Sequence, residues 1–90
     1  MTKARILTST DITEYMDKDE DITREKLITI MDKIIYEARV SGYDPDKIKL
    51  SNHLYKIYGK TDYRGLGVVS LPGTKQTTMQ LINASHIDSL

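Results

Sequence analysis

Apolar residues recur most regularly between residues 22 and 42. They return every three or four positions, as on one face of an α-helix, and comprise Leu27, Ile28, Ile30, Met31, Ile34, Ile35 and Ala38. At the helical rotation of about 100° per residue these side chains span an arc of roughly 160°, whereas a surface helix needs roughly 100° to contact one core. We therefore predict a long helix with more than one neighbour: a sheet and the N-terminal segment, or a second copy of the chain as well.

Both ends of this helix are marked in the sequence. Thr23 is of the residue type that caps helix N-termini, and Ile22 and Leu27 are spaced as a hydrophobic staple across it. At the other end, Gly42 is able to adopt the left-handed conformation that terminates helices, and Pro45 shortly after prevents the helix from resuming. The helix is therefore expected to begin after Thr23 and to end before Gly42.

Two shorter elements are predicted before the long helix. Residues 4–8 form a short strand or a loose arm, and Asp11 with Glu14 has the spacing of a capping box. That box predicts a helix of one or two turns ending at Met16, whose apolar side covers part of the long helix. Residues 17–21 are acidic and form a connector.

After the long helix the pattern changes to alternation. Residues 47–50 alternate polar and apolar side chains, as in a strand with one buried face. Ser51 is a suitable N-cap for a following helix, and Gly59 is suited to end it. The apolar positions between them repeat at helical spacing and are Leu54, Tyr55, Ile57 and Tyr58. A strand therefore runs directly into a short helix at residues 52–58.

The last third of the chain predicts two further strands. Residues 66–71 and 77–83 have the composition of strands, and Pro72–Gly73 supplies a turn after the first. Pro-Gly favours a type II turn, which matches a two-residue hairpin poorly, so a longer loop through Gln76 is expected. Together the elements predict an α+β fold: a small, mostly antiparallel sheet of three to four strands, one long helix packed on one face, and two short helices.

Length and composition fit one globular domain. The 90 residues, 39% apolar and 29% charged, are predicted to form a single domain over residues 1–90. Cysteine is absent, so disulfides, thiolate nucleophiles and cysteine-bound zinc are excluded, in agreement with a reducing compartment. The sequence has no apolar run of membrane-spanning length and no h-region of a signal peptide, and we expect a cytoplasmic protein.

The net charge of zero hides an uneven distribution along the chain. Residues 1–46 contain eleven acidic and seven basic residues, a net charge of −4, whereas residues 47–90 contain two acidic and six basic ones, a net charge of +4. This separation in sequence becomes a separation in space only if the two halves do not interleave in the fold.

The basic half includes a set of residues in which cations and aromatic rings are interspersed. It consists of Lys47, Lys49, Lys56, Tyr58, Lys60, Tyr63 and Arg64. Surfaces of this composition bind single-stranded nucleic acids, with phosphates on the cations and bases stacked on the rings. The zero net charge and the lack of an RNP, KH or helix-turn-helix pattern weigh against this function. Nucleic-acid binding is therefore the alternative hypothesis.

The acidic connector matches only part of a calcium-binding motif. Asp17, Asp19 and Asp21 stand at the first, third and fifth positions of an EF-hand loop. The position that requires glycine holds Ile22, and the position that requires a bidentate glutamate holds Ile28. A solvated connector explains these aspartates better than a calcium site.

Other candidate sites are equally incomplete. Ser51, His53 and Asp44 are the residue types of a catalytic triad but lack a nucleophile elbow. His86 and Asp88 lack a third metal ligand. We therefore predict no enzymatic activity, no cofactor and no metal site.

The aromatic residues are unusual in kind, with six tyrosines and neither phenylalanine nor tryptophan. Tyrosine is enriched at protein–protein interfaces because its ring is apolar and its hydroxyl tolerates water. Tyr36 and Val40 lie on the solvated side of the long helix, and Tyr43 follows its end. We predict that these three residues contact a protein partner, and the broad apolar face of the helix indicates a homodimer.

Residues 44–83 also resemble a segment of a known family. A strand at 48–50, a helix at 52–58, then Gly65-Leu66-Gly67-Val68-Val69 and Leu71-Pro72-Gly73, is an order similar to that in tailed-phage major capsid proteins. In those proteins a run ending in Leu-Tyr precedes a Gly-Val-Val-like strand and a Leu-Pro-Gly-like turn. Ninety residues leave no room for the extended arms and second domain of a capsid protein. The resemblance therefore implies a viral accessory or assembly-related protein, and we expect a small non-catalytic interaction protein.

Overall fold

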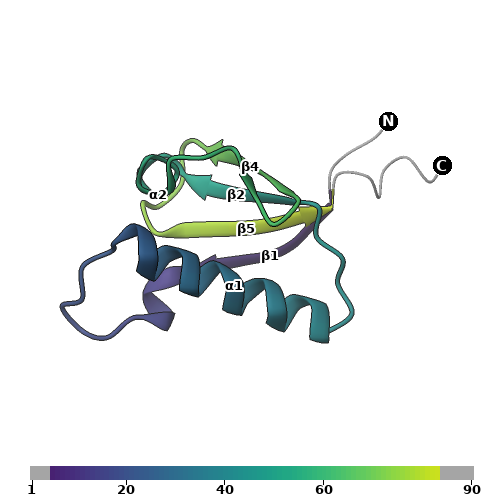
Figure 1. Cartoon of the computed structure of the whole chain (residues 1–90), viewed down its shortest axis with the longest axis horizontal. Helices are drawn as coiled ribbons and strands as arrows, with labels where there is room; N and C mark the ends of the chain where they lie inside the picture. The colour runs from purple at the N-terminus through teal and green to yellow at the C-terminus, as the bar shows by residue number, and fades with distance from the viewer. Residues whose placement is uncertain (1–4, 84–90) are drawn as a thin grey trace.

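The fold is a five-stranded sheet with one long helix lying across one of its faces (Figure 1). The computed structural model describes residues 5–83. In chain order the elements are β1 (Arg5–Asp11), the 3-10 helix η1 (Ile12–Tyr15), α1 (Arg24–Val40), β2 (Lys47–Ser51), α2 (Asn52–Tyr58), β3 (Asp62–Tyr63), β4 (Leu66–Leu71) and β5 (Thr78–Asn83). The strand order in the sheet is β1-β5-β2-β4-β3, and the predicted α+β class is confirmed.

The long helix α1 begins and ends where the sequence predicts. The Thr23 side chain accepts a hydrogen bond from a backbone N–H of the first turn at 3.1 Å and so satisfies one of the free donors there. Beyond the last turn, Gly42 has a φ of 93° and donates to the carbonyl of Arg39 at 3.0 Å. The N–H of Tyr43 donates to the carbonyl of Ala38, also at 3.0 Å. These two bonds form a Schellman motif, which fixes the path of the chain after the helix.

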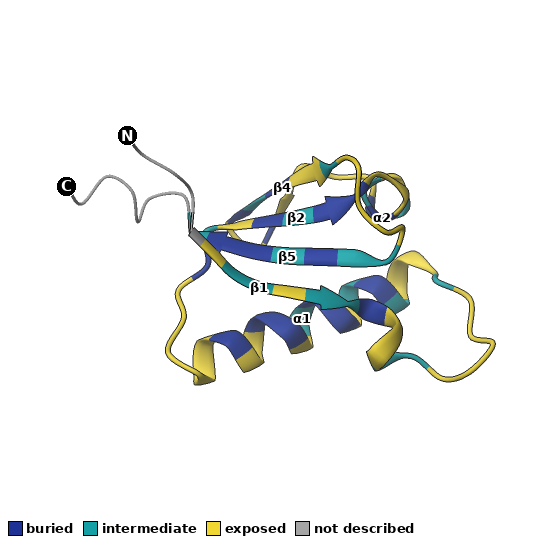
Figure 2. Cartoon of the chain, turned by 180° about the vertical axis from the view of Figure 1, so that it is seen from behind, coloured by how far each residue is buried: buried dark blue, intermediate teal, exposed yellow. Residues whose placement is uncertain are grey.

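The broad apolar face of α1 is covered within the chain. Its buried residues are Leu27, Ile30, Met31, Ile34, Ile35 and Ala38. These residues share one core with the buried residues of the central strands, and Ile12 of η1 and Leu54 of α2 are fully buried in the same core. Figure 2 shows buried and exposed segments alternating along α1, as on a helix with one covered side. The Tyr15 hydroxyl of η1 donates to Glu37 of α1 at 2.8 Å. The sheet and the N-terminal segment thus both pack against α1. The width of the apolar face of α1 therefore no longer requires a second copy of the chain.

The two predicted short helices differ in kind. The α-helix α2 has the predicted cap at Ser51 and ends at Gly59, which has a φ of 77°. The other is only a 3-10 turn. Its N-cap Asp11 accepts a hydrogen bond from the N–H of Thr13 at 3.0 Å, whereas a capping box would bond the N–H of Glu14. The Asp11 side chain therefore bonds two residues along the chain instead of three, and the element that follows is a 3-10 helix and not an α-helix.

The strand pairing corrects the sequence prediction. The sheet has five strands instead of three to four, because the two-residue strand β3 and the N-terminal strand β1 both belong to it. Three pairings are antiparallel, but β2 and β4 are parallel. They run in the same direction because α2 and β3 carry the chain back across the sheet between them. The strand β5 forms no hairpin with β4 and instead lies between β1 and β2.

Alternate residues of the central strands point to opposite faces of the sheet. The face toward α1 carries the buried residues Ile48, Leu50, Val68, Met79 and Leu81. On the other face, Lys49 is opposite both Val69 and Gln80, and all three are exposed or half-buried. We refer to this second face as the outer face of the sheet. Its polar composition is typical of a sheet with one solvated side.

Candidate functional site

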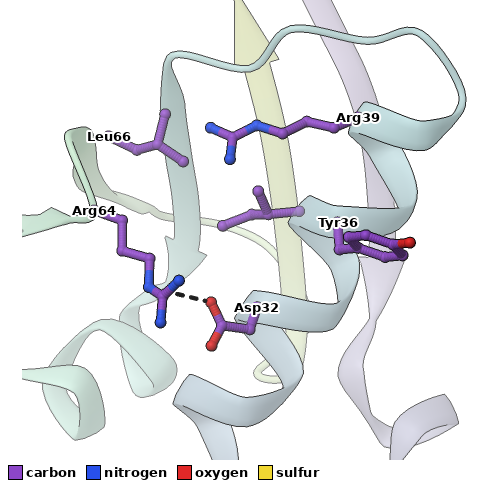
Figure 3. A pocket seen from close by; sticks show the side chains of 6 residues that line it. Asp32, Tyr36, Arg39, Arg64 and Leu66 are labelled. Carbon is purple, nitrogen blue, oxygen red and sulfur yellow. Dashed lines mark ion pairs between the residues drawn. The ribbon is translucent and has the colours of Figure 1, made fainter.

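Exposed apolar side chains gather at the C-terminal end of α1. Tyr36 and Val40, one helical turn apart, are each 69% exposed, and Tyr43 is 39% exposed. The first two lie on the side of α1 opposite its buried stripe, and Figure 3 shows the Tyr36 ring pointing away from the sheet. The Schellman motif holds the backbone of Tyr43 against the last turn. The structure thus brings together the three residues that the sequence indicated, which we call the Tyr36 surface.

A depression of about 290 Å³ adjoins the Tyr36 surface, between α1 and the start of β4. Its lining residues are Asp32, Ile35, Tyr36, Arg39, Arg64 and Leu66. The side chains of Arg39 and Arg64 extend over it from different elements (Figure 3). Ile35 and Leu66 are each 5% exposed and provide its apolar floor. We call this depression the arginine pocket.

Arg64 reaches the pocket from an uncommon backbone conformation. The strands β3 and β4 form a hairpin in which Tyr63 pairs with Leu66, so Arg64 and Gly65 are its two loop residues. Their φ angles of 49° and 82° have the sign that a type I′ turn requires. Asn-Gly is favoured in this turn, because the left-handed conformation costs most other residues about 1–2 kcal/mol. Arginine is therefore present here against the backbone preference of the turn.

Asp32 is held between Arg64 and a buried tyrosine. Its Oδ1 lies 3.5 Å from Nε of Arg64 and accepts a hydrogen bond from the Tyr63 hydroxyl. The Tyr63 ring meets the Tyr58 ring edge-on at a centroid distance of 6.1 Å, and the Arg64 guanidinium lies 5.7 Å from the Tyr63 centroid. Burial, and then the hydrogen bond to Asp32, raises the pKa of Tyr63 to about 12. Tyr63 therefore keeps its proton and orients the Asp32 carboxylate.

Tyr63→Phe is expected to remove a contribution to stability that is present at neutral pH and is lost at alkaline pH. The folded pKa of about 12 exceeds the unfolded value of about 10, so the contribution is complete below pH 10 and is lost as the pH rises towards 12. Urea denaturation should show the wild type exceeding the variant in free energy of unfolding at about pH 8, with a smaller difference at about pH 11. A difference that stays constant between these pH values would contradict the prediction.

The cations of the alternative nucleic-acid set lie in three separate places. Lys47 and Lys49 belong to the outer face of the sheet, and Lys56 and Lys60 lie on α2 and just after it. Arg64 belongs to the arginine pocket. The fold therefore spreads these residues over several elements instead of aligning them along one groove.

The two tyrosines of that set are buried, which corrects the role predicted for them. Tyr58 is 3% exposed and Tyr63 is 9% exposed. Their hydroxyls donate to the carbonyl of Asp62 and to the Asp32 carboxylate, respectively. A base stacks only on an accessible ring face, so neither tyrosine provides a stacking platform in this fold. The helical spacing of Tyr58 was the available signal that its ring joins the core.

A second depression, of about 340 Å³, lies at the start of α2. It is lined by Ser51, Asn52, His53, Lys56, Leu71, Gly73, Thr74 and Gln76. The Ser51 hydroxyl donates to the carbonyl of Gln76 at 2.6 Å and accepts from the N–H of Leu54 at 3.2 Å. His53 is exposed, and Asp44 does not line this depression. Ser51 therefore acts as a structural cap, and the three residues do not assemble as a triad here.

The remaining candidates concern metals and membranes. His86 and Asp88 lie outside the described residues. Within residues 5–83, no group of three or more His, Cys, Asp or Glu side chains is arranged to hold a metal ion. None of the helices in that range combines the length and the apolar character needed to cross a bilayer.

We compared the chain with protein-family models, with characterised proteins and with solved structures, and found no match in any of the three. The resemblance of residues 44–83 to a tailed-phage capsid segment therefore stays a prediction.

Proposed function

We propose that this chain is a non-catalytic protein that binds a partner protein through the Tyr36 surface. The observation that carries the proposal is a concentration of exposed apolar groups. In the part of the chain that the structure describes, five large hydrophobic side chains are exposed, and three of them lie between residues 36 and 43. Tyrosine contributes strongly to binding, because its ring buries a large apolar area with few rotatable bonds. The adjoining arginine pocket offers a hollow for a side chain of the partner.

We propose that the partner differs in sequence from this chain. The width of the apolar face of α1 was the reason to predict a homodimer, and the sheet, η1 and α2 cover that face within one chain. The Tyr36 surface that remains is small, whereas homodimer interfaces are typically large and more apolar. We propose an assembly protein as this partner, on the resemblance of residues 44–83 to a segment of tailed-phage major capsid proteins.

Tyr36→Ala is expected to weaken partner binding by about 10- to 30-fold, the effect of removing a central interface tyrosine. Because Tyr36 is 69% exposed, the free energy of unfolding should change by less than about 0.5 kcal/mol. Ile6→Ala is the matched control, since Ile6 is another apolar residue with 60% exposure but lies on β1. It should leave the dissociation constant unchanged.

The measurement has two steps. The wild type, Tyr36→Ala and Ile6→Ala are immobilised, and proteins from the source cells that only Tyr36→Ala fails to retain are identified. Each is then purified and titrated calorimetrically against all three chains. Equal dissociation constants for the wild type and Tyr36→Ala would contradict the proposal. Sedimentation equilibrium of the chain alone tests self-association: a dimer that Tyr36→Ala dissociates would make the partner a second copy.

A further inference from the structure

The arginine pocket combines two guanidinium groups with an apolar floor. Arg39 enters it from α1 and Arg64 from the β3–β4 turn, as Figure 3 shows. Ile35 and Leu66, both buried, lie in its lining. Guanidinium groups bind carboxylates through paired hydrogen bonds, and an apolar floor accepts an aliphatic side chain. The pocket therefore offers a cationic part for a carboxylate and, next to it, an apolar part for an aliphatic side chain.

The charges that line the pocket are not balanced. Asp32 is the acidic residue of the lining, and its carboxylate is already engaged by Arg64 and by the Tyr63 hydroxyl. Arg39 is exposed and forms no ion pair with any residue of the described range 5–83. With two arginines and one aspartate, the lining carries a net charge of +1. An anionic group complements it.

Arg64 pairs with Asp32 and lies over the Tyr63 ring, but its side chain is largely exposed, so both contacts contribute little to folding. Its left-handed backbone conformation favours asparagine or glycine. Its ion pair with Asp32 is largely exposed, at 72% for the Arg64 side chain and 43% for the Asp32 side chain. Exposed ion pairs contribute little to stability, because water and salt screen them. A side chain that neither suits its turn nor gains much from its neighbour points to a ligand outside the chain.

We propose that the arginine pocket receives an acidic, aliphatic segment of the partner protein. A Glu or Asp carboxylate binds Arg39 and Arg64, and a neighbouring aliphatic side chain packs on Ile35 and Leu66. Tyr36 lines the pocket and belongs to the Tyr36 surface, so one segment contacts both. This inference rests on the proposed function, because it names the chemistry of the partner at the same surface.

A nucleic-acid strand fits the pocket less well than an acidic peptide. The nearby ring of Tyr63 is buried and closed to the stacking of a base. An aliphatic floor matches a leucine or isoleucine side chain, whereas a nucleic-acid base stacks better on an aromatic ring. The lining therefore favours a peptide.

The test is a titration of the full chain with a defined peptide, acetyl-Gly-Glu-Leu-Glu-Ile-Gly-amide, followed by NMR at low salt. The Nε–Hε signals of Arg39 and Arg64 are expected to shift and to saturate together. The analogue with glutamine in place of both glutamates should bind at least about tenfold more weakly, because it loses the charge-assisted hydrogen bonds. Added salt should weaken the binding of the glutamate peptide only.

Two variants locate the binding. Arg39→Gln and Arg64→Asn are each expected to lower the affinity for the glutamate peptide by about tenfold or more. Arg64→Asn should unfold at the same temperature as the wild type or above it, because asparagine tolerates the left-handed conformation. Lys60→Gln is the control: it removes one positive charge from an exposed site that does not line the pocket and should leave the affinity unchanged.

Three results with the peptides would overturn the inference: no saturable shift of the two arginine signals, equal affinities for the glutamate and glutamine peptides, or equal effects of Lys60→Gln and Arg39→Gln. A short oligothymidylate that saturates the same signals at lower concentration than the peptide would also overturn it, in favour of a nucleic acid. If the chain does not bind the glutamate peptide but Tyr36→Ala still weakens binding of the purified partner, the proposed function stands. Only the acidic chemistry proposed for the partner is then wrong.

Discussion

Ser51→Ala is expected to lower the free energy of unfolding by about 2–3 kcal/mol. The Ser51 hydroxyl joins three segments, since it ends β2, caps α2 through the N–H of Leu54, and donates to the carbonyl of Gln76. Alanine removes the cap and leaves the buried N–H of Leu54 without an acceptor, which costs about 1–2 kcal/mol. It also removes the hydrogen bond to the carbonyl of Gln76, which costs about 1 kcal/mol more. Because Ser51 is 1% exposed, water cannot readily replace its hydroxyl.

Thr23→Ala provides the matched control for this prediction. Thr23 caps α1 with a similar hydrogen bond of 3.1 Å, but at an exposed position where water can satisfy the freed N–H. We expect this substitution to cost about 1 kcal/mol. Urea denaturation of the wild type and both variants at neutral pH measures the difference. If the two substitutions cost the same, Ser51 acts only as a cap and its bond to Gln76 adds nothing.

Val68→Ala is expected to destabilise the fold by about 2–3 kcal/mol. Val68 is 1% exposed and belongs to the core between the sheet and α1. Alanine removes two methyl groups from this core, and the surrounding side chains close only part of the cavity. The midpoint of chemical denaturation should therefore fall clearly below that of the wild type.

The neighbouring substitution Val69→Ala tests the assignment of the two faces. Val69 is the same residue type in the same strand, but it is 36% exposed on the outer face. Both variants lose the same β-branched side chain, so the difference between them reports burial alone. We expect Val69→Ala to cost about 1 kcal/mol or less. A larger loss at Val69 than at Val68 would mean that β4 is shifted by one residue in its register.

The sequence was most informative where a signal depends only on nearby residues. Thr23 and Ser51 both accept the predicted N-cap hydrogen bonds, and Gly42 and Gly59 both take the left-handed conformation that ends a helix. These signals are local, because a cap or a terminating glycine acts within one turn. The bounds of α1 and α2 were therefore predictable.

The order and direction of the strands were not predictable in the same way. The alternation in residues 47–50 identifies a strand with one buried face, but it carries no information about which strand lies beside it. The parallel neighbours Lys47 and Gly67 are brought together by the crossover through α2 and β3. The strand β3 has only two residues, which is too short for any periodic pattern. Pairing of this kind is decided by the packing of the whole chain.

The same distinction applies to the candidate site. The helical phase of α1 placed Tyr36 and Val40 on the exposed side, and the structure has them there. The arginine pocket was missed, because Asp32 and Arg64 are distant in sequence and meet only through the β3–β4 turn. The one local signal was the Arg64-Gly65 pair, which resembles the Asn-Gly of a type I′ turn.

The position of β5 between β1 and β2 affects when the sheet forms during synthesis of the chain. β5 is the neighbour of β1 in the sheet and also flanks β2, with Arg5 opposite Asn83 and Lys47 opposite Ile82. A nascent chain cannot assemble this sheet until residues 78–83 have left the ribosome, and β1 waits without its partner strand throughout that time. Folding must then close a loop that spans nearly the whole chain, which makes it slower than the folding of a helical protein of the same size.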